Sequence, residues 1–360
     1  MKRLIVLLSI IAVMAFSLIG CGNKEAADTN GTDGQSATTA PDSAAGSGDT
    51  QAEDTQGEDT PAEATQAPEP DDTQDTAEVP VYPRTYVDMA GREVVLEKEP
   101  VKISISYLPH WETLLMLGIQ PIATTYAEKY AAEWDALQGV DLGEYVNLGD
   151  TEVNLELLAS LEPDLILEQV ADVNSVNVEN YEKIAPVAVF GEKVKMDWRF
   201  ALREIAKVVG REQKAEEVIA EVDAKLAESR TKLQERYDGK TIILMSIMGE
   251  DRYYCAYRPD LYDKETGLGL NVPEGYPTEE TYIQVSMEAL VAMNPDYIFV
   301  NVFDGSEALL DGLNENSVWQ SLKAVKDGHF YRLDGSGHAA SALSTVYTVN
   351  FITDTLLENQ

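Results

Sequence analysis

Several residue types are scarce in this 360-residue chain, and their scarcity excludes whole classes of function. Lysine and arginine number 27 against 63 aspartates and glutamates, which gives a formal net charge of −36. Binding to nucleic acid or to an anionic membrane surface needs clustered basic side chains, so we expect neither partner. The chain has only two cysteines and three histidines, and these do not cluster with the spacing of metal ligands. We therefore expect no metal centre held by the protein itself.

The first 21 residues are typical of a secretory signal peptide. Lys2 and Arg3 precede an apolar run of 16 residues, which is short for a spanning helix of about 20 residues. The run ends in LIGC at 18–21, which resembles the bacterial lipobox. The resemblance implies cleavage before Cys21 and lipid attachment to it, on the extracytoplasmic face of the cell membrane of a Gram-positive-type organism. An ordinary signal peptide and an uncleaved anchor are the alternatives.

Residues 22–82 contain almost no large apolar side chains and carry 15 acidic residues against one lysine. Such a segment cannot bury enough surface to offset the entropy lost on ordering. We expect it to be a disordered acidic tether between the lipid anchor and a globular body.

Once Cys21 carries lipid, Cys255 is the remaining thiol, and one thiol cannot form an internal disulfide. Cys255 is either reactive or packed in a strand. Its aromatic and apolar neighbours, Tyr254 and Ala256, favour the packed strand.

From residue 83 the composition becomes globular, and short apolar runs alternate with helical patterns. This alternation is typical of parallel α/β units. The expected strands lie at 101–106, 121–125, 164–169, 186–190, 240–248, 296–302 and 329–334, and a helix is expected at 112–117.

One fifteen-residue pattern occurs twice at a constant offset of 132 residues. The copies read VNLELLASLEPDLIL at 153–167 and VSMEALVAMNPDYIF at 285–299. In each copy Asn154 or Ser286 is a natural N-cap, and the proline nine residues later ends the helix that follows. The repeat predicts two structurally similar lobes, over 83–196 and 238–360.

The longest helical pattern lies between the lobes, over 197–237. A first segment capped by Asp197 ends near Gly210, and a second runs from Glu212 to Tyr237 with one apolar stripe. At 1.5 Å per residue the second segment rises about 39 Å, enough to reach from one lobe to the other. The expected fold is α/β, with two similar lobes joined by one long α-helix.

These features together resemble the helical-backbone class (class III) of substrate-binding proteins of bacterial ABC importers for iron–siderophore, haem and cobalamin uptake. Further phrases that carry the resemblance are YVDMAGREVVLEKEP at 86–100, ETLLMLGIQPIATT at 112–125, NLGDTEVNLELL at 147–158, AKVVGREQKAEEVI at 206–219 and SVWQSLKAVKDGHFYRL at 317–333. The resemblance implies that the two α/β lobes joined by the long α-helix are Rossmann-like. It further implies a monomeric, lipid-anchored protein that captures an iron–siderophore chelate in the cleft between these lobes. It also implies delivery to a membrane permease dimer with its ATPase, with no cofactor and no catalytic residues.

Glu156 and Glu288 occupy the second helical position of the two repeats. A carboxylate there is stabilised by the helix dipole, by roughly 0.3–1 kcal/mol, and this alone explains its presence. The resemblance implies a further role, because an acidic residue at this place in each lobe docks onto arginines of the permease.

Loops that follow the strands line the cleft of such α/β sheets. Aromatic faces and guanidinium groups in these loops suit a large metal chelate, because they supply contact area, donors and charge. The expected cleft residues are Tyr107, His110, Trp111, Tyr126, Trp198, Arg199, Arg252, Tyr253, Tyr257, Arg258 and His338. Alternation at 253, 255 and 257 also fits a strand with its aromatic residues on one face.

Alternatives to siderophore transport stay open at this point. Haem would take His110 or His338 as axial ligand, and cobalamin suits the same scaffold. A surface adhesin would share the lipobox and the tether. An enzyme is suggested by the G-x-G-x-x-A match at 335–340, but only 20 residues follow it, too few for the second strand of a dinucleotide site.

Overall fold

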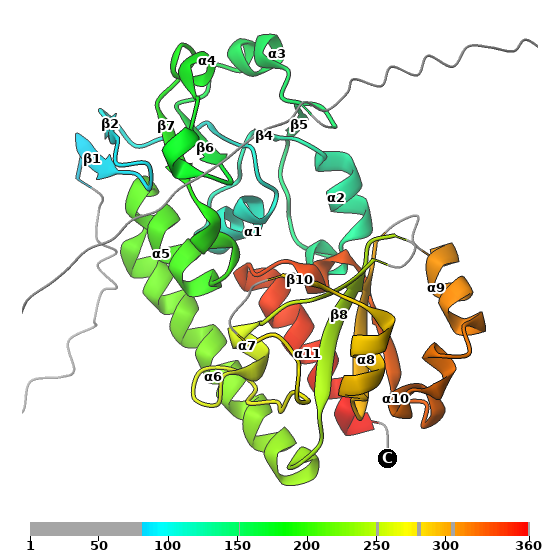
Figure 1. Cartoon of the computed structure of the whole chain (residues 1–360). Coiled ribbons are helices and arrows are strands. Elements are labelled where there is room, and N and C mark those ends of the chain that lie inside the picture. The colour runs from blue at the N-terminus through cyan, green and yellow to red at the C-terminus, as the bar shows by residue number, and fades with distance from the viewer. Residues whose placement is uncertain (1–80, 151, 250–251, 279–281, 304–306, 359–360) are drawn as a thin grey trace, which may run out of the picture. The chain divides into compact units, whose positions relative to one another are not determined.

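The structure is a computed structural model, and it describes residues 81–150, 152–249, 252–278, 282–303 and 307–358. The predicted signal peptide, Cys21 and the tether up to residue 80 lie outside the described residues. The described part contains two five-stranded sheets and one two-stranded hairpin (Figure 1). No helix in these ranges is both long and apolar enough to cross a membrane.

The first lobe is built on a sheet with strand order β5-β4-β3-β6-β7, in which all neighbours are parallel. Its strands are β3 (Ile103–Ile105), β4 (Ala123–Thr124), β5 (Val146–Asn147), β6 (Leu165–Gln169) and β7 (Val187–Phe190). The connecting helices are α1 (Pro109–Met116), α2 (Ala127–Glu133), α3 (Leu155–Ser160) and α4 (Glu179–Glu182). The hairpin of β1 (Arg84–Val87) and β2 (Glu93–Leu96) precedes them.

The second lobe has the order β10-β9-β8-β11-β12. Its strands are β8 (Ile242–Ile247), β9 (Tyr253–Cys255), β10 (Ile283–Val285), β11 (Tyr297–Val302) and β12 (Phe330–Leu333). Its helices are α7 (Pro259–Tyr262), α8 (Met287–Met293), α9 (Glu307–Glu315), α10 (Lys323–Lys326) and α11 (Ala342–Glu358). β9 runs antiparallel to β8, because the short link between them allows a hairpin but no helical crossover.

The two lobes share one strand order, which confirms the prediction of similar lobes. In each sheet the first strand is central, the next two lie on one side of it and the last two on the other. The repeated segments fall at equivalent places, α3–β6 in the first lobe and α8–β11 in the second. The expected strands of both series are also confirmed.

The likeness of the repeats extends to their hydrogen bonds and backbone angles. The Asn154 side chain accepts from the Leu157 amide at 3.0 Å, and the Ser286 hydroxyl accepts from the Ala289 amide at 3.2 Å. Both predicted N-caps are therefore confirmed. Glu162 and Asn294, which precede the two prolines, both have left-handed backbone angles, with φ of 50° and 40°.

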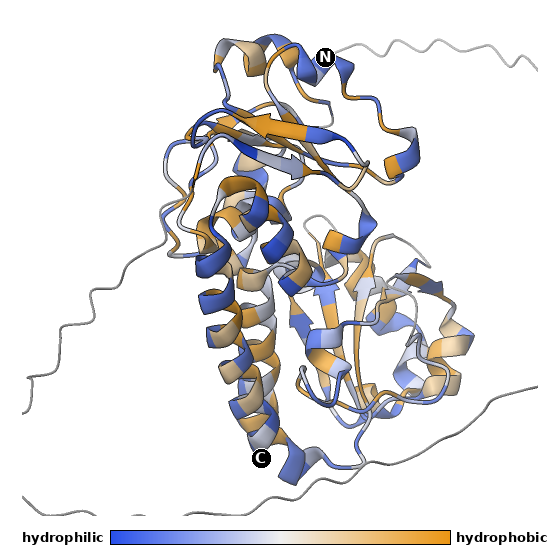
Figure 2. Cartoon of the chain, turned by 90° about the vertical axis from the view of Figure 1, so that its left-hand side faces the viewer, coloured by the Kyte–Doolittle hydropathy of each residue, from blue (hydrophilic) through white to orange (hydrophobic). Residues whose placement is uncertain are grey.

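Helices α5 (Trp198–Val209) and α6 (Glu212–Tyr237) join the lobes. The Asp197 carboxylate caps α5 by accepting from two backbone amides. Gly210 ends α5 in the left-handed region at φ 69°, where glycine pays no steric penalty. The bounds of α6 agree with the predicted helix. Figure 2 shows polar and apolar residues alternating along these helices.

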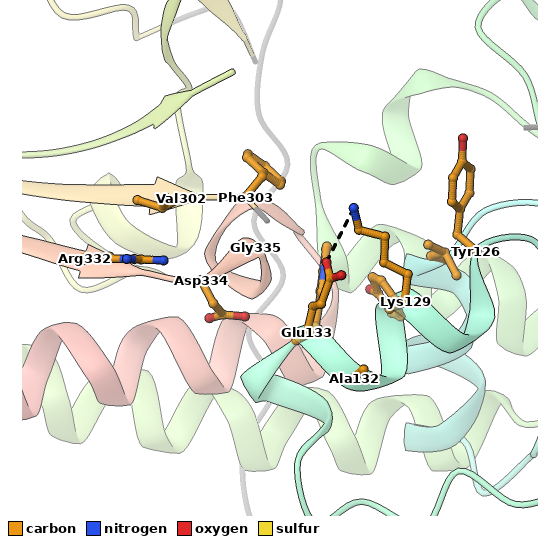
Figure 3. A pocket seen from close by; sticks show the side chains of 12 residues that line it. Tyr126, Lys129, Ala132, Glu133, Val302, Phe303, Arg332, Asp334 and Gly335 are labelled. Atoms are coloured by element: carbon orange, nitrogen blue, oxygen red, sulfur yellow. Dashed lines mark ion pairs between the residues drawn. The ribbon is translucent and has the colours of Figure 1, made fainter. Parts of the chain in front are cut away.

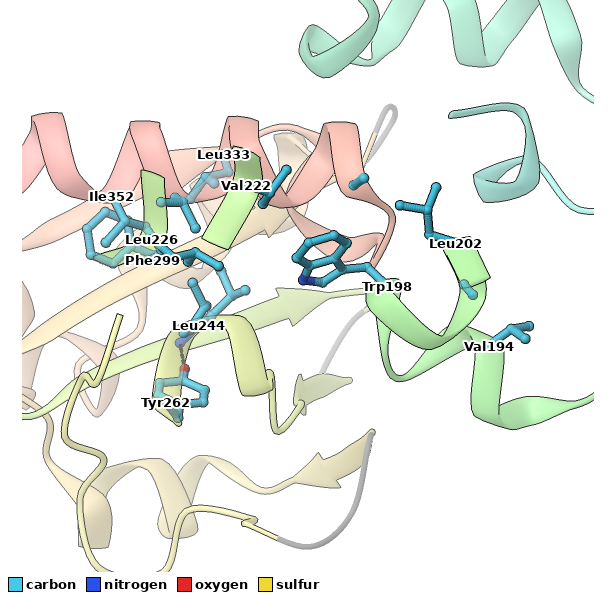
Figure 4. Packing of buried hydrophobic residues seen from close by; sticks show 14 of the residues in the cluster. Val194, Trp198, Leu202, Val222, Leu226, Leu244, Tyr262, Phe299, Leu333 and Ile352 are labelled. Atoms are coloured by element: carbon cyan, nitrogen blue, oxygen red, sulfur yellow. Dashed lines mark hydrogen bonds between the residues drawn. The ribbon is translucent and has the colours of Figure 1, made fainter. Parts of the chain in front are cut away.

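One continuous cluster of buried apolar side chains connects both lobes through these helices (Figure 4). It includes Trp198 and Leu202 from α5, Val222 and Leu226 from α6, Leu244, Phe299 and Leu333 from the second sheet, and Ile352 from α11. Each large apolar side chain buried in it contributes about 1.5–3 kcal/mol to stability. The lobes therefore share a core and are not joined by a bare linker.

Candidate functional site

A cavity of about 460 Å³ lies between the lobes at the carboxyl ends of their strands (Figure 3). Small-molecule sites occupy about 300–1,000 Å³. The first lobe contributes α2 and the loops on either side of it. The second lobe contributes the ends of β11 and β12 and the turn after β12. This is where ligands bind in doubly wound α/β sheets.

A second hollow, of about 730 Å³, is larger but lies in the first lobe alone. Lys102, Ile122 and Tyr145 line it, and each directly precedes a strand. It is therefore at the amino ends of the strands, opposite to the edge that binds ligands in such sheets. The cavity between the lobes is the better candidate site.

Helix α2 forms the first wall of the cavity. Tyr126, Lys129, Tyr130 and Glu133 line it, and their spacing of three and four residues places them on one helical face. The Nζ atom of Lys129 lies 3.7 Å from Oε2 of Glu133. Tyr126 adopts a left-handed conformation at φ 53° just before the helix begins, and its side chain is exposed. This wall thus offers an accessible phenol and an ion pair.

Two adjacent aromatic rings, tilted by 42° to each other, continue this wall. The ring centroids of Tyr130 and Trp134 are 4.0 Å apart, and both residues line the cavity. The Tyr130 hydroxyl donates to the buried carboxylate of Glu112. Burial and the neighbouring Glu112 hold the pKa of Tyr130 well above its usual value. The phenol is therefore neutral and fixed, which gives the cavity a rigid aromatic surface.

The turn after β12 forms the second wall and contacts the first lobe. Asp334 accepts from the Ser336 amide at 3.0 Å and from the Asp135 amide at 2.9 Å. The Ser336 hydroxyl accepts from the Ala136 amide at 3.0 Å. A Cβ on Gly335 would lie 3.0 Å from the indole nitrogen of Trp134, so glycine allows this close approach. The two walls are thereby held together beside the cavity.

An aromatic group adjoins the second wall. The His338 ring lies edge-on to Phe303, which lines the cavity, with centroids 5.3 Å apart, and edge-on to Tyr282 at 5.0 Å. Tyr282 stacks on Tyr254 at 4.7 Å. Burial, aided by the charge of Arg258, lowers the pKa of His338 to about 4. The imidazole is therefore neutral near pH 7.

Among the residues predicted for the cleft, Tyr126 is the one that the structure places in the described cavity wall. Five others are buried inside the lobes and expose at most 6% of their surface: His110, Trp111, Trp198, Tyr253 and Arg258. The loop after β3 is shorter than we expected, because α1 begins at Pro109. Its first turn carries His110 against Phe190 and Trp111 against Tyr145, in the core.

Arg258 is buried behind the second wall and contacts the turn that follows β12. Its guanidinium makes two hydrogen bonds to Asp260, at 2.8 and 2.6 Å, and donates to the Gly337 carbonyl at 2.7 Å. A buried arginine needs such partners to offset its desolvation. Arg258 therefore positions the turn that follows β12 and does not itself line the cavity.

The other predicted residues lie apart from the cavity wall. Arg199 contacts Asp223 of α6 and donates to the Thr266 carbonyl. Arg252 donates a hydrogen bond to the Met248 carbonyl. The ammonium group of Lys195 lies over the Tyr107 ring, and the Tyr257 ring contacts the Tyr262 ring. Sequence reasoning did not single out Lys129, Glu133, Trp134, Phe303 and Arg332. Helical spacing from Tyr126 onward would have revealed the first two.

Glu156 and Glu288 both lie exposed in the first turn of their helices, α3 and α8. Hydrogen bonds from its own backbone amide and from Ser286 lower the pKa of Glu288. Two equivalent carboxylates are thus presented by equivalent elements of the two lobes. Their role in docking stays a prediction.

Cys255 is fully buried in β9, as the packed-strand interpretation predicts. Burial raises the pKa of its thiol to about 12, which keeps it protonated and unreactive. Within the described ranges, no group of three histidine, cysteine, aspartate or glutamate side chains is arranged to hold a metal ion.

Comparison with known proteins agrees with this architecture. Residues 105–336 match the model of a family described as periplasmic binding protein. The iron(3+)-hydroxamate-binding protein FhuD of Bacillus subtilis is 33% identical over 228 residues, covering 58% of this chain and 68% of that protein. The probable siderophore-binding lipoprotein YfiY of the same organism is 28% identical over 268 residues, covering 70% and 80%.

A solved structure shares the fold. The triscatecholate siderophore binding protein FeuA of Bacillus subtilis, in complex with ferri-bacillibactin, matches with a TM-score of 0.62. It is 22% identical in sequence, and the match covers 77% of this chain and 99% of that chain. The two-lobed arrangement is therefore one that holds a siderophore in another protein.

Proposed function

The chain belongs to the periplasmic binding protein family, and from that premise we propose that it is the solute-binding component of an ABC importer for ferric siderophores. The observation that carries the proposal is the cavity at the carboxyl ends of both sheets. Its aromatic residues supply contact area for a bulky chelate, and Lys129 and Arg332 supply donors for the oxygen atoms around iron. FhuD and YfiY, which are similar over most of their length, are named for binding such ligands.

Capture follows from the geometry of the two walls. A chelate that enters between α2 and the end of β12 loses water on both faces, while the ring contact between Tyr130 and Trp134 and the hydrogen bond from Tyr130 to Glu112 already hold this part of the wall in place. Such preorganisation reduces the entropy lost on binding. The lobes share a core, so closure involves modest flexing of the connecting helices.

Attachment to the membrane is part of the same proposal. Cys21 would carry the lipid, and residues 22–82 would let the binding body move above the extracytoplasmic surface of a Gram-positive-type membrane. The name of YfiY as a lipoprotein supports this location. Mass spectrometry of the mature chain would find an acylated Cys21, and an unmodified or uncleaved N-terminus would contradict the anchor.

Delivery requires a permease, and we assign its recognition to Glu156 and Glu288. Because the two glutamates occupy equivalent positions in similar lobes, they suit a partner with two equivalent subunits. Each would meet a basic side chain of one permease subunit. The ATPase that drives such importers binds the permease and needs no contact with this chain.

Isothermal titration calorimetry with a ligand panel tests the proposed function. The panel contains ferrichrome, ferric desferrioxamine, ferri-bacillibactin, haemin and cobalamin, each with its iron-free form where one exists. We expect micromolar or tighter binding of at least one ferric siderophore. Binding of haemin or cobalamin alone would show that the ligand is not a siderophore. If no compound of the panel binds, a surface adhesin becomes the better hypothesis.

Haem is the less well supported ligand. His110, one of its two candidate axial ligands, is buried, and its Nε2 atom has no contact with solvent. The other, His338, is enclosed between two aromatic rings.

A further inference from the structure

We propose, on the basis of the function proposed above, that the cavity selects ferric siderophores of low net charge, of the trishydroxamate class, over trianionic triscatecholates. Membership of the family does not decide which class of siderophore is bound, because FhuD is named for hydroxamate ligands and FeuA for triscatecholate ligands. The charges of the cavity wall distinguish the two classes.

The described cavity wall carries two cations and two anions. Lys129 and Glu133 pair on α2, and Arg332 and Asp334 lie on the opposite wall (Figure 3). These formal charges cancel. Each guanidinium or ammonium group thus has a carboxylate in the same wall, and the wall presents no surplus of positive charge to an anionic ligand.

Contacts within the fold hold the carboxylates of Asp334 and Glu133 in place. Asp334 is held by the amides of Ser336 and Asp135 and by the Ser336 hydroxyl. It cannot move without breaking a contact between the lobes. Glu133 lies one helical turn from Lys129 and remains beside it as long as α2 is folded. The charge balance therefore persists when a ligand enters.

The ligand classes differ in net charge by their chemistry. Three hydroxamate groups, each singly charged, neutralise one ferric ion, whereas three doubly charged catecholates leave a large negative surplus. An anion in a partly desolvated cavity needs excess positive charge to offset its lost hydration. This wall supplies none, and its two carboxylates repel an anion.

A chelate of low charge meets no such penalty. Its carbonyl and hydroxamate oxygens can accept hydrogen bonds from Lys129 and Arg332. Its apolar arms can pack on the exposed faces of Tyr126, Trp134 and Phe303. The mixture of balanced charge and aromatic area matches such a ligand.

Competition between probes of different charge tests the proposal. Affinities of the full chain are measured for ferrichrome, ferric desferrioxamine and ferri-bacillibactin at low salt. We expect the two hydroxamate chelates to bind at least about tenfold more tightly than ferri-bacillibactin. Glu133→Gln should narrow this gap by about tenfold, because it removes the carboxylate beside Lys129.

Glu128→Gln is the matched control, since it removes the same charge from an exposed position on α2 outside the cavity wall. It should leave the ratio of affinities unchanged. Equal or tighter binding of ferri-bacillibactin by the unmodified chain would overturn the charge selection and leave the proposed function intact. An equal effect of the two variants would also overturn it. Failure of all three probes to bind would instead remove the proposed function.

Discussion

The carboxylate of Glu112 in the first lobe accepts hydrogen bonds from both the amide and the hydroxyl of Ser344 in α11, at 2.8 and 3.0 Å. The hydroxyls of Ser341 and Tyr130 donate to the same carboxylate. Glu112 is fully buried, and burial raises its pKa against the opposing effect of these donors. A side chain of α1 thus caps the amino end of the last helix and couples it to the cavity wall.

Replacing this carboxylate should destabilise the fold. In Glu112→Gln one of the two acceptor oxygens becomes an NH₂ group and the negative charge is lost, so the four groups that donate to the carboxylate lose charged acceptors and the hydroxyls among them must reverse their hydrogen bonds. We expect the free energy of unfolding in urea to fall by roughly 2–4 kcal/mol. Glu128→Gln, an exposed change, should alter it by less than about 0.5 kcal/mol. A loss of that small size in Glu112→Gln would contradict the capping role.

Acid should destabilise the protein partly through His110. Burial, aided by the charge of Lys195, lowers the pKa of His110 to about 3, whereas an unfolded histidine titrates near about 6.5. Below about pH 6.5 the unfolded chain therefore binds a proton that the folded chain does not bind until about pH 3. The stability contributed by the neutral ring is lost progressively as the pH falls through this window.

The variant His110→Phe isolates this effect, since phenylalanine keeps the ring packed on Phe190. Between about pH 6 and pH 5 the unmodified chain should lose about 1 kcal/mol more stability than the variant. Urea denaturation at both pH values measures the difference. If the free energy of unfolding falls equally with pH in the two proteins, His110 is not the cause of the acid destabilisation.

Cys255 should resist alkylation as long as the chain is folded. Its thiol is buried and its pKa is raised to about 12, and iodoacetamide reacts with the thiolate. A Cys21→Ser variant leaves Cys255 as the one thiol to follow. We expect no labelling at neutral pH and rapid labelling in urea. Fast labelling of the folded chain would contradict the burial.

Permease docking should depend on both helix-start glutamates. Cells that carry the matching permease and the Glu156→Ala, Glu288→Ala double variant should lose ferric-siderophore uptake, because each lobe loses its charged contact. Ligand affinity should stay unchanged, since neither residue lines the cavity. The pair Glu128→Ala and Glu235→Ala removes two exposed helical carboxylates elsewhere and serves as control. Normal uptake by the first double variant would rule out the assignment.

The fold could be predicted from sequence because its determinants are local. Asn154 and Ser286 begin helices, the prolines that follow end them, and Gly210 separates α5 from α6. The repeat at a fixed offset then predicted two similar lobes, because the same local pattern is expected to fold in the same way at both places.

The site was predicted less well, because it depends on contacts between distant segments. Trp134 and Gly335 are far apart in the chain, and they meet only when the turn after β12 approaches α2. Trp111 and His110 were expected in the cleft because they follow a strand, but an early start of α1 turns both into the core. Aromatic composition alone does not distinguish a cavity wall from a core.

The most direct test of the account is whether a ferric siderophore quenches Trp134, the tryptophan of the cavity wall. Titration of the full chain with ferrichrome should quench its fluorescence in a saturable manner. In Trp134→Phe most of that quenching should disappear, while calorimetry still detects binding. Trp198→Phe, a change in the buried core, should retain most of it. Quenching that survives in Trp134→Phe and is lost in Trp198→Phe would contradict the location of the binding site between α2 and β12.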